Sequence, residues 1–269
     1  MLNDITLGQY FPGKSPIHLL DPRTKILAVV AYISTIFLAE DYLAYGILIA
    51  FAALAVGVSQ IPFRMVLKSI KPLWIIIILT LAIHVFSTPG SVIFSLGPLT
   101  ATQEGARTGI LMSIRLVLLI AVSSLLTFTT SPIALTDGIE RLLNPFRRLG
   151  VPAHELAMMM TIALRFIPTL LEEADRIMKA QMARGADFSS GNMLNRAKSM
   201  VPLLVPLFIS AFRRADELAV AMEARCYRGG ENRTRMKELR MGTRDAVAAG
   251  TFIILIAVLT LVKVYKITL

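Results

Sequence analysis

Long apolar runs alternate with short polar intervals along the first half of the chain, and one more apolar run closes it. A helix that crosses a bilayer needs about 20 mainly apolar residues. Five runs approach this length and are predicted to span a membrane: Ile26–Ala39, Tyr42–Ser59, Pro72–Thr88, Thr108–Thr130 and Ala246–Val262. The first helix should begin at Asp21-Pro22, because an N-cap aspartate followed by proline is a typical helix start.

Basic residues mark one side of the predicted membrane. The intervals on that side carry Lys14, Arg23, Lys25, Arg64, Lys68 and Lys71. The intervals Glu40-Asp41 and Pro89–Ala106 carry none. Because short cytoplasmic loops retain Lys and Arg, the N-terminus and the segment after Thr130 are predicted to be cytoplasmic.

The segment 131–245 has a different pattern, in which apolar positions at helical spacing alternate with charges. It holds 18 of the 28 Lys and Arg residues. Three helices are predicted there, over Pro132–Leu149, Ala153–Ala183 and Gly191–Tyr227. Arg165 and Pro168 interrupt the second helix, and the apolar part of the third is too short to span, so both are expected to lie along the membrane.

These patterns predict an all-α integral membrane protein with about five transmembrane helices. A cytoplasmic or interfacial layer of amphipathic helices is inserted before the last span. The expected parts are a cytoplasmic N-terminal segment (1–25), a four-helix transmembrane region (26–130), the basic helices (131–245) and the last transmembrane helix (246–269).

A short repeat lies inside the basic region. Ala174–Gly185 aligns with Ala215–Cys226 at an offset of 41 residues, and each copy ends in Ala-Arg-X: Ala183-Arg184-Gly185 and Ala224-Arg225-Cys226. Helix capping explains one such ending, since cations and glycine suit helix C-termini. Two copies favour a duplicated binding function, in which each arginine forks onto a carboxylate or carbonyl of a partner.

The rest of the composition argues against other classes of protein. One cysteine and three scattered histidines offer neither a disulfide nor a metal cluster, and no grouped carboxylates or Ser/His/Asp set suggests an enzyme. The net charge of +10 suggests a nucleic-acid binder as one alternative. A basic cytoplasmic flank before the last span explains the charge of Arg233–Arg244 without nucleic acid. A self-contained secondary transporter needs ionisable groups within the membrane. Only Arg115 and His84 qualify, and Arg115 is expected to meet a headgroup or a carbonyl.

Gly8–Ser15 matches the Walker A pattern G-x-x-x-x-G-K-[ST]. That motif binds phosphate only as a strand-to-helix turn of an α/β sheet. Here Pro16 follows directly and a membrane helix starts soon after, so we predict an ordered turn with its corner at Pro12-Gly13 instead.

Several segments together resemble the CbiQ/EcfT family, the transmembrane coupling proteins of energy-coupling factor (ECF) transporters, a branch of the ABC importers. They are Gly8-Gln9-Tyr10, Pro12-Gly13, Ser15-Pro16, Leu20–Lys25, Ala183-Arg184-Gly185 and Ala224–Gly229. The last two are similar to the paired X-Arg-X motifs of that family, although Cys226 stands where Gly or Ser is more usual.

The resemblance implies a non-catalytic subunit of the bacterial inner membrane that serves vitamin or micronutrient uptake. Two ATPase subunits, which carry ATP and Mg, would each bind one X-Arg-X motif, and a separate membrane S component would bind the solute. The expected S-component contacts are Met158, Met159, Leu203, Leu204, Leu207 and Phe208. A module shared by several S components is favoured, with a dedicated cobalt, nickel or biotin module as the alternative.

Overall fold

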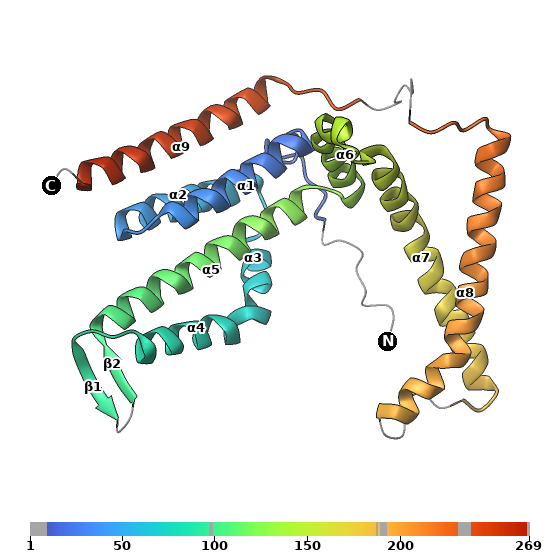
Figure 1. Ribbon diagram of the computed structural model, residues 1–269, viewed down its shortest axis with the longest axis horizontal. Helices are drawn as coiled ribbons and strands as arrows, with labels where there is room; N and C mark the ends of the chain where they lie inside the picture. The colour runs from blue at the N-terminus through green and yellow to red at the C-terminus, as the bar shows by residue number, and fades with distance from the viewer. Residues whose placement is uncertain (1–9, 97–98, 187, 189–192, 231–237, 268–269) are drawn as a thin grey trace. The chain divides into compact units, whose positions relative to one another are not determined.

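The structure is a computed structural model that describes residues 10–96, 99–186, 188, 193–230 and 238–267, and it is mainly helical (Figure 1). The chain forms two compact units. Residues 10–138 with 238–267 are called here the bundle unit. Residues 139–230 are called the hairpin unit.

The bundle unit contains five long helices and four short elements. In chain order they are α1 (Pro22–Leu38), α2 (Tyr42–Ser59), α3 (Phe63–Ile70), the 3-10 turn η1 (Lys71–Leu73), α4 (Trp74–Ser87), β1 (Val92–Leu96), β2 (Leu99–Thr102), α5 (Gln103–Thr129) and α9 (Thr243–Ile267). The first half of α6 (Pro132–Leu143) also belongs to this unit. All five predicted spans are therefore helices.

Four helices of the bundle unit, α1, α2, α5 and α9, share one apolar core. Tyr32 and Leu48 are fully buried in it, and the Tyr32 hydroxyl donates to the Leu48 carbonyl at 2.7 Å. The ring of Phe51 stacks on Tyr32 and meets Phe252 of α9 edge to face, with centroids 5.9 and 5.1 Å apart. These aromatic contacts join α9 to helices that lie two hundred residues earlier in the chain.

Five helical segments are long and apolar enough to cross a membrane: Tyr42–Ser59, Phe63–Ser87, Gln103–Thr129, Ala153–Ala183 and Thr243–Tyr265. The predicted number of about five is confirmed. Their identity differs at two places. Helix α1, which was predicted to span, has 17 residues and is shorter than these five. Helix α7 (Ala153–Ala183) was predicted to lie along the membrane, but it is long and apolar enough to cross one.

Two intervals that were predicted as loops contain regular structure. Residues 63–73 form α3 and η1, and residues 92–96 pair with residues 99–102 as the antiparallel strands β1 and β2. Strand β2 ends at Thr102. The Thr102 hydroxyl donates to the Thr88 carbonyl and accepts from the Gly105 amide at the start of α5. This N-cap joins the ends of α4 and α5.

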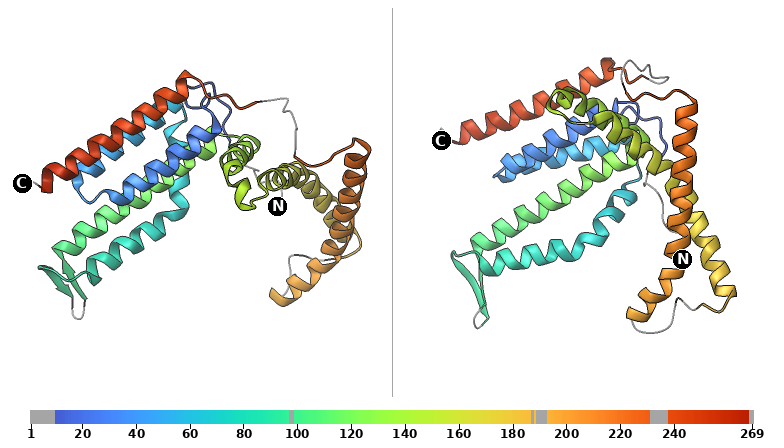
Figure 2. Two further views of the ribbon diagram at one scale, coloured as in Figure 1. Left: turned by 45° about the horizontal axis from the view of Figure 1, so that its top comes forward. Right: turned by 45° about the vertical axis from the view of Figure 1, so that its right-hand side comes forward.

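The hairpin unit holds the end of α6, the 3-10 segment η2 (Asn144–Leu149), α7 and α8 (Met193–Ala224). The long helices α7 and α8 cross each other, as both views in Figure 2 show. At the crossing, Glu173 accepts from Ser210 at 2.7 Å and from Arg214 at 2.8 Å. Both helices run through internal prolines, which are Pro168, Pro202 and Pro206.

Candidate functional site

The first X-Arg-X motif forms the C-terminal cap of α7. The Arg184 amide donates to the Gln181 carbonyl, the Gly185 amide to Met182, and the Ala186 amide back to Gln181. Gly185 has φ +89°, the left-handed conformation that ends a helix in this way. Glycine adopts it without steric cost.

The second motif ends α8 with the same bonds, shifted by 41 residues. The Arg225 amide donates to Met222, the Cys226 amide to Glu223, and the Tyr227 amide back to Met222. Cys226 has φ +57° and so takes the place of Gly185. The repeat predicted from the sequence is thus a repeat of helix endings. Gly229-Gly230 lie beyond this cap.

Both arginine side chains are exposed, as are Ala183 and Ala224 beside them. Among the described residues, neither guanidinium has a hydrogen-bond or ion-pair partner. Arg184 follows the end of α7 and Arg225 the end of α8, so the motifs lie at opposite ends of the crossed pair (Figures 1 and 2). Helix α8 is about 48 Å long at 1.5 Å per residue, so one groove could not receive both arginines.

The predicted S-component contacts lie on α7 and α8 with different exposure. Met159, Leu204 and Phe208 are 55%, 49% and 60% exposed, and Met158 and Leu207 are half-buried. Leu203 is only 6% exposed. The contact of all six residues with the S component stays a prediction. Successive positions on a helix point in different directions, which explains why Leu203 and Leu204 differ in exposure.

The segment after the second motif is held against the start of α7 by His154. Its Nδ1 lies 3.0 Å from the Glu140 carboxylate and its Nε2 lies 3.3 Å from the Tyr227 hydroxyl. Gly230 passes so close to the imidazole that a Cβ there would collide with the ring. The three side chains therefore fix the turn that carries Arg225. Sequence reasoning missed them because they lie far apart in the chain.

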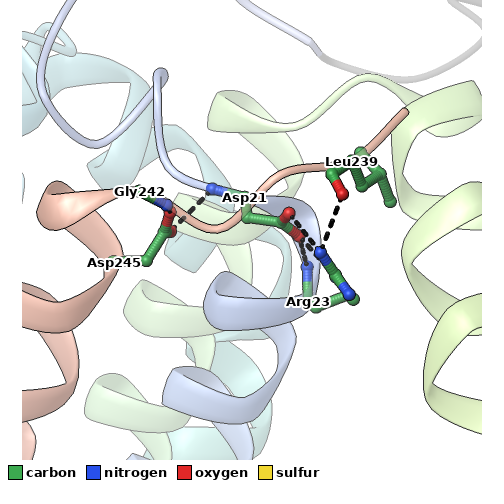
Figure 3. A network of polar contacts seen from close by, with 5 residues as sticks. All are labelled: Asp21, Arg23, Leu239, Gly242 and Asp245. Atoms are coloured by element: carbon green, nitrogen blue, oxygen red, sulfur yellow. Dashed lines mark hydrogen bonds and ion pairs between the residues drawn. The ribbon is translucent and has the colours of Figure 1, made fainter. Parts of the chain in front are cut away.

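A second polar cluster joins the N-termini of α1 and α9 (Figure 3). One oxygen of Asp245 accepts from the Asp21 amide at 2.9 Å, and the other accepts from the Gly242 amide at 2.8 Å. Asp21 caps α1 by accepting from the Arg23 amide, and its carboxylate pairs with the Arg23 guanidinium at 2.9 Å. A single buried carboxylate, Asp245, thus caps α9 and binds the cap residue of α1.

This cluster, called here the clasp, also holds the chain where it leaves and re-enters the bundle unit. Arg23 donates to the Leu239 carbonyl at 3.2 Å. On the other side, Gly138 lies against Pro22, where an added Cβ would be 3.0 Å from the proline Cβ. The hydrogen bond from Arg23 to Asp21 raises the pKa of the Arg23 guanidinium above its usual value, so the pair stays charged. Gly138, where the chain leaves the bundle unit, and Leu239, just after it re-enters, therefore both contact the turn 21–23.

Lys25 and the turn before α1 complete this end of the bundle unit. The buried Lys25 ammonium donates to the Thr129 carbonyl at 2.8 Å and to the His18 carbonyl at 3.1 Å. Thr129 is the last residue of α5, where a cation is favourable. Ser15 is buried and bonded to His18 at 2.6 Å. Residues 10–20 form turns with no helix directly after Ser15, so the described part of the Walker-like segment does not form a phosphate loop.

Arg115 also has partners inside the bundle unit. Its guanidinium donates to the Tyr45 hydroxyl at 3.0 Å and to the Ala39 carbonyl at 3.4 Å, and it lies over the Phe37 ring. Of the two predicted partners, a carbonyl is therefore observed. Arg115 thus joins α5 to the region where α1 ends and α2 begins. These contacts explain an arginine inside the bundle unit without a transported ion.

The comparisons with known proteins decide the family. The family model described as "Cobalt transport protein" (CbiQ) matches residues 13–236. The chain belongs to the CbiQ/EcfT family. It is 64% identical over 263 residues to an energy-coupling factor transporter transmembrane protein EcfT of Acidaminococcus fermentans, covering 98% of each chain. It is 48% identical over 260 residues to the EcfT of Bacillus subtilis, covering 96% of this chain and 98% of the relative.

A third relative, the EcfT of Thermosediminibacter oceani, is 61% identical over 247 residues, which is 92% of this chain and 93% of that one. As a member of the CbiQ/EcfT family, the chain is a multi-pass membrane protein and the transmembrane component of an ECF transporter. The resemblance seen in the N-terminal segment and the two X-Arg-X motifs is confirmed at the level of the family. The partners of each motif remain a prediction.

Proposed function

We propose that this chain couples ATP hydrolysis by two ATPase subunits to the movement of a separate substrate-binding S component. The observation that carries the proposal is the pair of exposed arginines on two helix caps with the same backbone bonds, neither of which has a side-chain partner among the described residues. Arg184 and Arg225 lie at opposite ends of the crossed helices, which suits two similar sockets on two similar subunits. ATP and Mg would bind to those subunits, and this chain would be non-catalytic.

The crossed pair suggests how motion would pass through the hairpin unit. If ATP closes the ATPase pair, the distance between its sockets changes, and the crossing of α7 and α8 changes with it. The exposed apolar side chains Met159, Leu204 and Phe208 would then shift against the S component. Such coupling requires different contacts in two states. The length of crosslinker that joins positions 184 and 225 should therefore differ with and without ATP.

Co-purification tests the arginines directly. The chain would be expressed with its ATPases and candidate S components, comparing wild type with Arg184→Glu/Arg225→Glu. A matched control is Arg176→Glu/Arg213→Glu, which makes the same charge change at exposed positions of the same helices. The motif variant should lose the ATPases, while the control retains them. Recovery of ATPases by both variants would refute the proposal.

The sole cysteine tests both orientation and interface. We propose that the N-terminus and the hairpin unit are cytoplasmic, in the bacterial inner membrane. Cys226 is exposed beside Arg225, so an impermeant maleimide should label it in inside-out vesicles and not in right-side-out vesicles. Bound ATPase subunits should protect it. Labelling from the outer side would reverse the topology, and unprotected labelling in the intact complex would place the ATPase elsewhere.

The solute is proposed only at the level of class, a vitamin or micronutrient, with a shared module favoured over a dedicated cobalt, nickel or biotin module. The S component captured with the wild-type chain would identify it. Capture of several different S components would support a shared module. A chain purified without any ATPase or S component would instead favour a self-contained transporter.

A further inference from the structure

Helix α3 lies across the end of the bundle unit, unlike its long neighbours α4 and α5 (Figure 1). Its residue Val66 is 3% exposed and packs with Leu125 and Phe128 in the last turns of α5. This places α3 at the end of the bundle where α5 finishes. A short helix in this position lies where the headgroup region of a bilayer meets the end of a span.

The remaining surface of α3 is divided into an apolar stripe and a basic stripe. Phe63 and Leu67, four residues apart, are 65% and 49% exposed. Arg64, Lys68 and Lys71 follow the same helical spacing one position later, and all three are exposed. The two stripes therefore run side by side along the helix.

Within the described part of the chain, the basic stripe has no acidic partner. No Asp or Glu occurs between Asp41 and Glu104 in the sequence. Among the described residues, Arg64, Lys68 and Lys71 form no ion pair. Three unpaired cations on one side of a helix complement a surface that carries negative charge.

The apolar stripe continues into a surface that suits lipid. Trp74, the only tryptophan, follows directly at the start of α4 and is 55% exposed. Beyond it, Ile75, Ile76 and Leu79 of α4 are 62%, 52% and 56% exposed. Tryptophan at the boundary between apolar and polar surface is typical of a membrane interface.

We propose that α3 is an interfacial binding site for anionic phospholipids. Arg64, Lys68 and Lys71 contact the phosphate groups, and Phe63 and Leu67 insert among the upper parts of the acyl chains. Charge complementarity and continuity with the exposed apolar side of α4 select lipid as the occupant. The proposal depends on the membrane location of the chain and not on the coupling role of the arginine motifs.

Quenching of Trp74 measures the lipid next to α3, because no other tryptophan contributes. The chain would be reconstituted in mixed vesicles in which either phosphatidylglycerol or phosphatidylcholine carries brominated acyl chains. For the wild type we expect phosphatidylglycerol to be enriched about threefold or more near Trp74, since each basic residue attracts anionic lipid. Arg64→Gln/Lys68→Gln should reduce this preference to near one.

The matched control removes one arginine and one lysine from the opposite end of the bundle unit. Arg107→Gln/Lys263→Gln should leave the preference at Trp74 unchanged. A second variant, Phe63→Ser/Leu67→Ser, should weaken quenching by both lipids alike. Unchanged Trp74 emission in unbrominated vesicles establishes that each variant is folded.

With the isolated chain, two outcomes would overturn the proposal. One is equal quenching by the two lipids around the wild-type chain. The other is a preference for phosphatidylglycerol that survives Arg64→Gln/Lys68→Gln. Loss of the preference on binding of ATPase or S subunits would also overturn it, because the basic stripe would then be a protein contact.

Discussion

The clasp of the bundle unit and the caps of the hairpin unit both place charged side chains at helix ends, but they bury them to opposite extents. In the clasp, Asp21 and Asp245 are about 6–7% exposed and bonded to backbone amides or to Arg23. At the caps, Arg184 and Arg225 are exposed and unpartnered among the described residues. Buried charge must be satisfied within the chain, whereas charge intended for another subunit has to remain available. The two regions should therefore respond differently to substitution.

The largest effect is expected at the caps and should appear only in assembly. Arg184→Glu or Arg225→Glu should weaken ATPase binding about 30-fold or more, since a lost buried pair costs about 2–5 kcal/mol. The double variant should abolish binding. The unfolding midpoint of the isolated chain should stay near that of wild type, because both side chains are exposed. Affinity and unfolding measured on the same samples separate the two effects.

A comparable loss of the isolated chain's stability would contradict this contrast between the regions. It would mean that the arginines have partners within the chain. Arg176→Glu/Arg213→Glu, on the same helices, again provides the control for charge alone.

The clasp should show the reverse behaviour. Asp245→Ala leaves the amides of Asp21 and Gly242 without their acceptor, which should lower the free energy of unfolding by about 2–4 kcal/mol. The exposed Glu40–Lys263 pair is the comparison, and Glu40→Ala should change stability far less. Denaturant unfolding in detergent measures both. Equal effects would show that burial of the clasp does not matter.

A smaller effect is expected at His154, which contacts Glu140 and Tyr227. His154→Ala should free the turn after Arg225 and speed amide exchange there about tenfold, since two side-chain bonds of about 0.5–1.5 kcal/mol are lost. Tyr227→Phe removes only one of them and should give an intermediate rate. Hydrogen exchange measures both variants. Unchanged rates would mean that the backbone alone orders the turn.

The smallest effect concerns the difference between the two caps. Cys226 adopts a left-handed conformation that costs a non-glycine residue about 1 kcal/mol. Cys226→Gly should therefore slow exchange of the Tyr227 amide about fivefold, and Gly185→Ala should speed exchange of the Ala186 amide by a similar factor. Cys226→Ser, which keeps the strain, is the control. If the Tyr227 amide exchanged at the same rate in Cys226→Gly and Cys226→Ser, the left-handed conformation at position 226 would carry no such cost.

Much of the fold was predictable because apolar runs need no tertiary information. Tyr42–Ser59 and Ala153–Ala183 were predicted with the bounds that α2 and α7 have. Helix α3 was missed, since a single amphipathic helix of 8 residues in a basic interval reads as a loop. The hairpin of β1 and β2 was missed because its pairing depends on contacts across the turn.

The candidate site was predictable only in part. The offset of 41 residues identified Arg184 and Arg225, because the same helix ending uses the same local sequence. The different exposure of Leu203 and Leu204 could not be read from the sequence, since both are leucine and only packing decides which of them is buried. Asp245 accepts from the amide of Asp21, which lies 224 residues earlier in the chain. Its only local signal in the sequence is weak, an acidic residue in the first turn of α9.

The amino-acid sequence by itself determined the membrane helices, the basic segment between them and the repeated arginine endings, since hydrophobicity and helix capping act over a few neighbouring residues. Only the tertiary structure decided that α3 lies across the bundle end, that the turn 21–23 contacts both Gly138 and Leu239, and that the two arginines lie at opposite ends of a crossed pair. These features depend on which distant groups meet, and a buried carboxylate or amide is satisfied by whatever the fold brings to it.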